Sequence, residues 1–150
     1  MTVYGKEFAA VYDDQWAFWG PKMWPFLSQM VAARCPHART WLDLCCGCGS
    51  LLKFVCEGGF EAVGLDISPH QLKHAKRSAP SARFVHCDVR QLDLPRKFDV
   101  ITCQFDSLNY LTCKKDIELR AGLAFEKYDG NTLSAAGERS GRLLYLCRHQ

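Results

Sequence analysis

The chain has 150 residues, of which 48% are hydrophobic and 23% charged, and its formal net charge is +3. This composition is typical of one globular domain. The weak positive charge is spread along the chain without a long run of Lys and Arg, so we expect no nucleic-acid partner. No apolar stretch is long enough to cross a membrane, and the first residues lack the layout of a signal peptide. We therefore expect a cytoplasmic protein without a membrane partner.

The chain contains nine cysteines, an odd number, and most of them lie in apolar stretches. This usage is typical of reduced thiols that pack as small hydrophobes. Cys45, Cys46 and Cys48 are close enough in sequence to bind a soft metal in principle. Successive strand side chains point to opposite faces, however, so Cys45 and Cys46 cannot readily share an ion. We expect no metal site, and we expect Cys48 to be the most exposed and oxidisable thiol.

The segment from residue 4 to residue 34 is rich in aromatic side chains. The Gly20-Pro21 pair is expected to interrupt it, and the apolar spacing predicts a helix over 21–34. Pro25 would then lie in about the first turn, where a missing backbone N–H costs little. We expect this segment to cover the sheet that the following residues form.

Residues 40–45 predict a short apolar strand, and Gly47 and Gly49 then break it before a helix over 50–57. A glycine turn between a strand and a helix directs backbone N–H groups toward a ligand at the helix N-terminus. A dinucleotide fingerprint requires a small third residue, but Leu52 stands at that position. No Lys-Ser or Lys-Thr pair follows the glycines, so the pattern is not a phosphate loop either.

A second predicted strand, 61–66, ends in Asp66, which lies 17 positions after Gly49. This is close to the spacing of about 20 at which nucleotide-binding α/β folds place a ribose-binding acid. Ser68 can cap the next predicted helix, over 69–78. A third predicted strand, 82–87, is followed by Asp88.

A fourth predicted strand, 98–105, is continuously apolar, as a central parallel strand should be, and is followed by Asp106. Residues 117–127 can form a helix, and 141–147 read as a fifth strand. Strands that alternate with helices predict an α/β fold with a parallel sheet, whose ligands lie at the carboxyl ends of the strands. The acids after strands two, three and four would meet at that edge.

Asp43 to Gly49 reads D-x-C-C-G-x-G, which resembles motif I of the class I S-adenosylmethionine-dependent methyltransferases. Gly64-Leu-Asp-Ile-Ser68 resembles the second motif of that family, and Phe105 to Leu111 resembles a segment of bacterial small-molecule methyltransferases. The resemblance implies a Rossmann-like three-layer sandwich with a mostly parallel sheet of strand order 3-2-1-4-5. The C-terminal antiparallel hairpin of the family is expected to be missing here.

The resemblance also implies one methyltransferase-like domain over residues 1–150. Residues 1–39 would form a helical lid, 40–112 the cofactor-binding core, and 113–150 a shortened or divergent C-terminal part. A strand at 141–147 without a hairpin beyond it would be an exposed edge. Such an edge could recruit a second copy of the chain as a homodimer, or a strand from another partner.

The cofactor implied by the resemblance is S-adenosyl-L-methionine, with S-adenosyl-L-homocysteine as its product. The implied cofactor-binding residues come from the lid and the strand ends: Tyr12, Asp43, Cys45, Gly47, Gly49, Asp66, Ile67, Asp88, Val89 and Gln104. Asp106 and Tyr110 are candidates for a catalytic base by position. Asp106 could equally cap a helix, and Tyr110 could simply pack.

The expected function is methyl transfer to a small-molecule acceptor. The alternative is a module that binds S-adenosylmethionine or S-adenosylhomocysteine with little or no turnover, because its C-terminal sheet is truncated. A different α/β nucleotide binder, such as a dehydrogenase, is disfavoured by Leu52.

Overall fold

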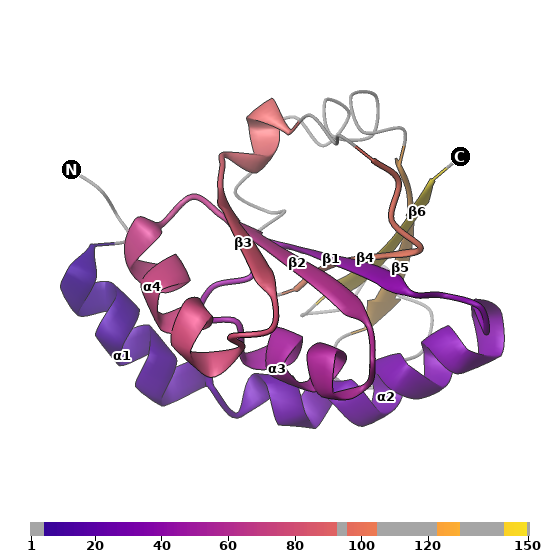
Figure 1. Cartoon of the computed structure of the whole chain (residues 1–150), viewed down its shortest axis with the longest axis horizontal. Helices are drawn as coiled ribbons and strands as arrows, with labels where there is room; N and C mark the ends of the chain where they lie inside the picture. The colour runs from indigo at the N-terminus through magenta and orange to yellow at the C-terminus, as the bar shows by residue number, and fades with distance from the viewer. Residues whose placement is uncertain (1–4, 93–95, 105–122, 130–142, 150) are drawn as a thin grey trace.

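A six-stranded sheet forms the centre of the molecule (Figure 1). The computed structural model describes residues 5–92, 96–104, 123–129 and 143–149. The strand order is β3-β2-β1-β4-β6-β5. The strands are β1 (Thr40–Leu44), β2 (Glu61–Asp66), β3 (Arg83–His86), β4 (Val100–Cys103), β5 (Leu123–Asp129) and β6 (Leu143–His149). The helices are α1 (Lys6–Trp16), α2 (Trp19–Arg34), α3 (Ser50–Glu57), α4 (Pro69–Ser78) and a 3-10 turn, η1 (Val89–Gln91).

The first four strands confirm the predicted parallel order 3-2-1-4. β1 pairs in parallel with both β2 and β4, and β2 pairs in parallel with β3. Leu44, at the end of β1, is in register with Leu65 of β2 and Cys103 of β4. The carboxyl ends of these strands therefore meet at one edge of the sheet, as a Rossmann-like α/β fold requires.

The C-terminal part corrects the prediction. β6 contains most of the predicted fifth strand and lies next to β4, as the order 3-2-1-4-5 implies, but it pairs antiparallel with β4. β5 pairs antiparallel with β6, so the expected absence of an antiparallel hairpin is wrong. An antiparallel pair needs no crossover helix, whereas a parallel strand does. The predicted helix over 117–127 is likewise wrong where it overlaps β5. β6 lies between β4 and β5, so the expected exposed edge at 141–147 does not exist there.

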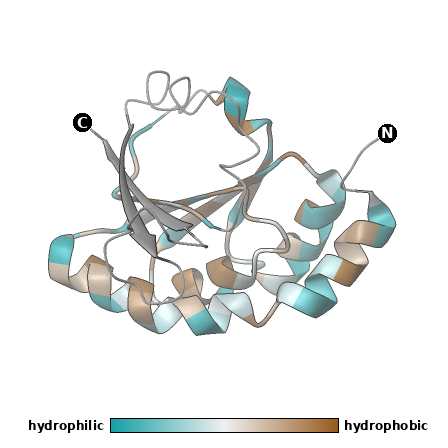
Figure 2. Ribbon diagram, turned by 180° about the vertical axis from the view of Figure 1, so that it is seen from behind, coloured by the Kyte–Doolittle hydropathy of each residue, from teal (hydrophilic) through white to brown (hydrophobic). Residues whose placement is uncertain are grey.

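The helices α2 and α3 pack on one face of the sheet, beneath β1 in the view of Figure 1. Their core includes the fully buried side chains of Leu27, Trp41, Leu52 and Val55. A second apolar cluster on the opposite face includes Leu42, Leu44 and Ile101. Hydrophobic and hydrophilic residues alternate along the helices (Figure 2), as expected of helices with one buried face.

The helix α2 begins at Trp19, so Gly20-Pro21 lies in its first turn and does not interrupt the segment. Proline is tolerated there because the first N–H groups of a helix have no intrahelical partner. Gly20 is buried, and a Cβ at this position would lie 2.2 Å from the carbonyl oxygen of Ser50. The glycine therefore lets α2 contact the start of α3. Pro25 falls in the interior of α2 and not in its first turn.

Among the residues that the structure describes, no helix is long and apolar enough to cross a lipid bilayer.

Candidate functional site

The loop between β1 and α3 turns sharply through left-handed backbone conformations. Cys45, Gly47 and Gly49 have φ values of 55°, 53° and 73°. Such values favour glycine, and Cys45 adopts one despite its Cβ. Gly49 precedes α3 and packs against α4, because a Cβ there would lie 3.0 Å from Ala75 Cβ. The loop is thus held close to α4 with its backbone directed toward the strand ends.

Asp66, at the end of β2, ties this loop to the next one. Its Oδ2 accepts a hydrogen bond from Gly47 N at 2.9 Å, and its Oδ1 accepts one from Ser68 N at 2.8 Å. Burial raises the pKa of Asp66, whereas these backbone hydrogen bonds oppose the rise. Ser68 caps α4, as predicted, by accepting from Gln71 N. The sequence pointed to Asp66 as a ligand-binding acid but gave no indication of its bond to the glycine loop.

Asp43 lies below the loop on β1 and is only 3% exposed. Thr102 Oγ1 of β4 donates to Asp43 Oδ1 at 2.7 Å, and Trp41 Nε1 donates to Thr102 Oγ1 at 2.9 Å. Burial raises the pKa of Asp43 to about 7; the Thr102 hydrogen bond opposes this rise, and the charge of Asp66 adds to it. Trp41 and Thr102 were not predicted as site residues. The polar Thr102 stands within an apolar strand, and this pattern could have indicated a buried hydrogen bond.

Gln104 follows β4 and is also buried. Its side-chain oxygen Oε1 has no hydrogen-bond partner among the residues that the structure describes. Buried amide oxygens almost always accept a hydrogen bond, so this atom fits a ligand that brings an N–H or O–H donor. Asp43 and Gln104 belong to adjacent parallel strands or their ends, and together they offer acceptors at one edge of the sheet.

Tyr12, in α1, lies over the glycine loop. A Cβ built on Gly47 would be 3.4 Å from Tyr12 Cε1, and the tyrosine ring packs between Phe8 and Trp16 with centroid distances of 5.6 and 6.2 Å. The structure thus brings Tyr12 next to the glycine loop. A role in binding stays a prediction.

Cys48 contradicts the expectation of an exposed, oxidisable thiol. It is only 3% exposed. Burial, together with the nearby charge and hydrogen bond of Asp13, raises its pKa to about 11. A thiol with such a pKa is a weak nucleophile at neutral pH, so Cys48 has a packing role. Among the described residues, no group of three or more His, Cys, Asp or Glu side chains could hold a metal ion.

Asp88 begins η1 and is paired with a residue that was not predicted. Its Oδ1 accepts from the backbone N–H of Arg90 at 2.9 Å, and the Arg90 guanidinium bonds to both carboxylate oxygens. The Arg90 side chain and backbone hydrogen bonds hold the pKa of Asp88 below its usual range. Val89 is buried against the sheet, whereas Ile67 is 48% exposed.

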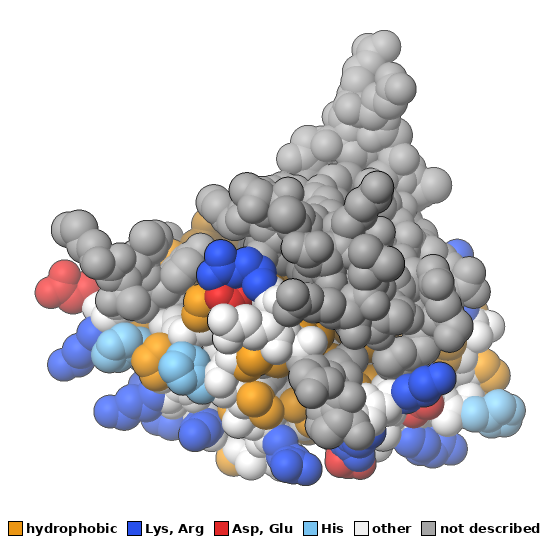
Figure 3. Space-filling view, turned by 90° about the horizontal axis from the view of Figure 1, so that it is seen from above, with side chains coloured by type: hydrophobic (Ala, Val, Ile, Leu, Met, Phe, Trp, Pro, Cys, Tyr) orange, Lys and Arg blue, Asp and Glu red, His pale blue; other side chains and the backbone are white. Residues whose placement is uncertain are grey.

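The carbonyl of Ile67 lies 2.8 Å from Nε2 of His86, whose side chain is exposed. Asp106 and Tyr110 lie outside the described residues. Seen from above (Figure 3), the described Lys and Arg side chains are scattered among acidic, histidine and apolar ones.

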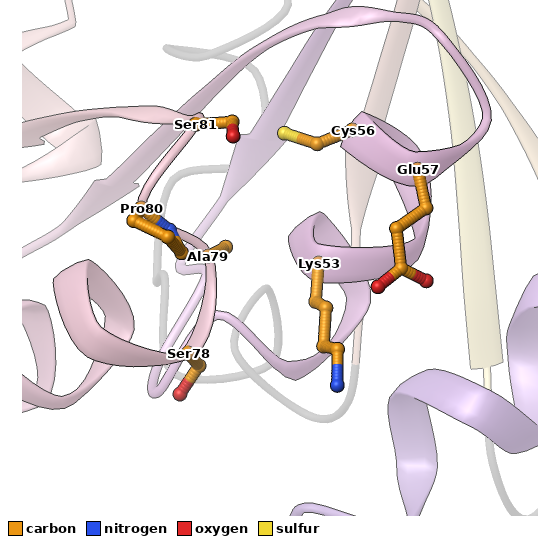
Figure 4. Close-up of a pocket in the computed structure, with 7 residues that line it drawn as sticks. All are labelled: Lys53, Cys56, Glu57, Ser78, Ala79, Pro80 and Ser81. Atoms are coloured by element: carbon orange, nitrogen blue, oxygen red, sulfur yellow. The ribbon is translucent and has the colours of Figure 1, made fainter.

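A separate pocket of about 270 Å³ lies away from these strand ends (Figure 4). It lies between the C-terminal ends of α3 and α4, the ends that lead into the starts of β2 and β3. It is lined by Lys53, Cys56, Glu57, Ser78, Ala79, Pro80 and Ser81. The pocket is therefore distinct from the edge at which Gly47, Asp66 and Gln104 lie.

The chain matches the family model described as "Methyltransferase domain" over residues 42–123. The chain belongs to this methyltransferase family. The matched region begins within β1 and includes the glycine loop, Asp66 and Gln104, so the family match covers the edge described above.

Two relatives of the methyltransferase domain illustrate the match. The dTDP-3-amino-3,4,6-trideoxy-alpha-D-glucopyranose N,N-dimethyltransferase of Streptomyces venezuelae is 32% identical over 120 residues, which cover 80% of this chain and 45% of the relative. The putative methyltransferase YqeM of Bacillus subtilis is 33% identical over 122 residues, which cover 73% of this chain and 45% of the relative. The chain thus spans about half the length of these curated relatives.

Solved structures share the fold of the methyltransferase domain. An S-adenosylmethionine-dependent methyltransferase from Clostridium acetobutylicum superposes with a TM-score of 0.73 at 18% identity, covering 95% of this chain and 98% of that one. The amino pentose methyltransferase CalS10 from Micromonospora echinaspora, solved with bound SAM, gives a TM-score of 0.64 at 25% identity, covering 81% and 51%.

Proposed function

We propose that this domain binds S-adenosyl-L-methionine and transfers its methyl group to a small-molecule acceptor. The observation that carries the proposal is the convergence of Asp43, Gly47, Asp66 and Gln104 at one edge of the sheet. Relatives named as amino-sugar N,N-dimethyltransferases support a small acceptor. S-adenosyl-L-homocysteine would be the product.

The acceptors at this edge fit the polar ends of the cofactor. The carboxylate of Asp66 retains lone pairs beyond its two backbone hydrogen bonds and can accept from ribose hydroxyls. Asp43 and the unpaired Oε1 of Gln104 suit a donor such as an ammonium group. Backbone atoms of Cys45, Gly47 and Gly49 would line the cofactor. When bound, S-adenosylmethionine supplies an electrophilic methyl group on a sulfonium centre.

The other proposed cofactor contacts come from residues at the rim of the site. Asp88 and the backbone of Val89 would recognise the adenine edge, and the exposed side chain of Ile67 would pack against the base. For Asp88, this contact would have to coexist with Arg90 or displace it. Tyr12 would close the site over Gly47 and exclude water.

The contribution of this domain to the reaction is mainly the alignment of acceptor and cofactor. Such alignment can lower the barrier of a two-reactant displacement by about 7–11 kcal/mol. A base is needed only for an acceptor that arrives protonated, and Asp106 and Tyr110 are proposed for that role by position. The binding-only alternative is not favoured, since β6 and β5 extend the sheet that it assumed to be truncated.

We further propose a single domain with residues 1–39 as its cover, 40–112 as the cofactor-binding core and 113–150 as a divergent C-terminal part. The cytoplasmic location is supported by the cysteine usage, since the seven cysteines that the structure describes form no disulfide with one another. We also propose that the domain has no nucleic-acid partner. The expected homodimer is not proposed, because it required an exposed edge at 141–147 and β6 lies between β4 and β5.

Isothermal titration of the chain with S-adenosylmethionine, S-adenosylhomocysteine and NAD tests the cofactor. We expect binding of the first two and none of NAD. Gly47→Val should abolish binding, because it combines a φ of 53° with a side chain beside Tyr12. Gly59→Val is the matched control, since Gly59 also has a positive φ but no described atom lies within 4 Å of its added Cβ. Equal loss in both variants would contradict the site assignment.

Turnover is tested by S-adenosylhomocysteine release in a screen of amino-sugar acceptors. Binding without release under any acceptor would favour the binding-only alternative.

A further inference from the structure

Asp13 joins three elements beside the glycine loop. It follows Tyr12 in α1, and its Oδ2 lies 2.8 Å from Nδ1 of His74 in α4. An ionised carboxylate only accepts hydrogen bonds, so the imidazole N–H is the donor. Asp13 also lies near the thiol of Cys48, where its negative charge helps to raise the pKa of that thiol. Cys48 lies between Gly47 and Gly49 in the loop.

Neither contact is between sequence neighbours. Asp13 and His74 are 61 positions apart, and their side chains are 34% and 21% exposed. The partly buried pair therefore fixes α1 against α4 more firmly than a fully exposed ion pair would. The adjacent Tyr12 lies against Gly47 from the same helix. Loss of the Asp13 contact should consequently change how Tyr12 packs on the glycine loop.

We propose that Asp13 is a positioning residue that holds α1 against the glycine loop, so that Tyr12 closes the cofactor site. The inference rests on the proposed function, because it assigns a role in cofactor binding to a residue that makes no contact with the cofactor itself. His74 is the residue to which Asp13 is bonded, and Cys48 of the loop lies near the same carboxylate.

The test compares S-adenosylhomocysteine affinity in the full chain for Asp13→Ala, Tyr12→Ala and the double variant. Asp13→Ala should weaken binding by about five- to tenfold, at the low end of the usual coupling between sites. If Asp13 acts through Tyr12, then Asp13→Ala should have little further effect in the Tyr12→Ala background. Asp13→Asn, which keeps an acceptor oxygen for His74, should restore part of the affinity.

Asp14→Ala is the matched control, since Asp14 is the exposed acid next in the same helix. It should bind S-adenosylhomocysteine as the wild type does. Full additivity of Asp13→Ala and Tyr12→Ala would overturn the inference, as would wild-type affinity in Asp13→Ala. If Asp13 had only a structural role, the Asp13→Ala variants would have lower unfolding midpoints, but the effects of Asp13→Ala and Tyr12→Ala on S-adenosylhomocysteine affinity would be additive.

Hydrogen exchange of the α1 amides in the unliganded chain supplies a measurement that needs no cofactor. Asp13→Ala should speed exchange in residues 6–16 relative to Asp14→Ala, and equal rates would overturn the inference. A wild-type chain that bound no S-adenosylhomocysteine would refute the proposed function; the assigned role in cofactor binding would then fall too, even if α1 exchanged faster.

Discussion

Asp43→Asn should stabilise the unliganded chain at high pH while weakening cofactor binding. Burial raises the pKa of Asp43 from its ordinary value of 3.8 to about 7. Between these two pH values, Asp43 is protonated in the folded chain and ionised in the unfolded chain. Stability is highest below the unfolded pKa and falls as the pH rises toward 7. The full loss is about 4 kcal/mol, since each pKa unit corresponds to about 1.4 kcal/mol.

The amide introduced by Asp43→Asn keeps the acceptor oxygen that Thr102 requires. It also buries an NH2 group, which costs about 1–3 kcal/mol if it finds no partner. The variant should therefore gain about 1–3 kcal/mol over the wild type at pH 8. At pH 5, where folded Asp43 is protonated, the gain should shrink by about 3 kcal/mol and can become a loss.

Urea unfolding at pH 5 and pH 8 measures this difference directly. Asp99→Asn is a useful control, because hydrogen bonds from Arg39 and Thr40 lower the pKa of Asp99. Its contribution to stability is present above the unfolded pKa of 3.8 and is lost only as the pH falls below that value, so Asp99→Asn should have the same effect at pH 5 and pH 8. An Asp43→Asn effect that is the same at both pH values would refute the linkage argument.

The same variant should bind S-adenosylhomocysteine at least about tenfold more weakly, since a buried carboxylate paired with a cation is worth several kcal/mol. In the wild type, affinity should fall as the pH drops below about 7, because Asp43 must then lose a proton to accept the ammonium group. Calorimetry in buffers of different ionisation enthalpy would detect the released proton.

Three further substitutions test the surroundings of the loop. Asp66→Ala should abolish cofactor binding and also lower the unfolding midpoint, because it leaves Gly47 N without its acceptor; a calorimetric affinity equal to that of the wild type would contradict the assignment. Gly64→Ala should destabilise by about 1–3 kcal/mol in urea, since its Cβ would lie 2.5 Å from Leu52 Cδ1. Cys45→Gly should gain about 0.5–1 kcal/mol by relieving a φ of 55°, and an unchanged urea midpoint would mean that the strain is negligible.

The parallel half of the sheet could be predicted because its signals are local. Each of the strands β1, β2 and β4 is an apolar run that ends at a glycine or a polar residue, and Ser68-Pro69 marks the start of α4. The spacing from Gly49 to Asp66 then placed both residues at the same edge. The structure adds the hydrogen bond from Gly47 N to Asp66, which joins the glycine loop to the end of β2.

The contacts around Asp43 that the sequence did not reveal are long-range. Trp41 to Thr102 and Thr102 to Asp43 span 61 and 59 positions, and no local pattern indicates that Thr102 of β4 meets Asp43 of β1. The pairing of β5 with β6 was missed because residues 117–127 were predicted as a helix. The antiparallel orientation of β6 was missed for another reason. A strand has the same alternation in either direction, so periodicity cannot fix its orientation.

Three groups that destabilise the unliganded chain lie together at the ends of β1 and β4. Cys45 holds a left-handed backbone conformation, Asp43 is buried with a pKa near 7, and Gln104 Oε1 has no partner among the described residues. Each feature lowers the stability of the unliganded chain, and all three belong to the ends of β1 and β4. Such concentration is typical of a site prepared for a ligand. A cationic group that donates hydrogen bonds would relieve two of the three at once, which is why a cofactor with an ammonium group fits this edge better than a neutral or anionic one.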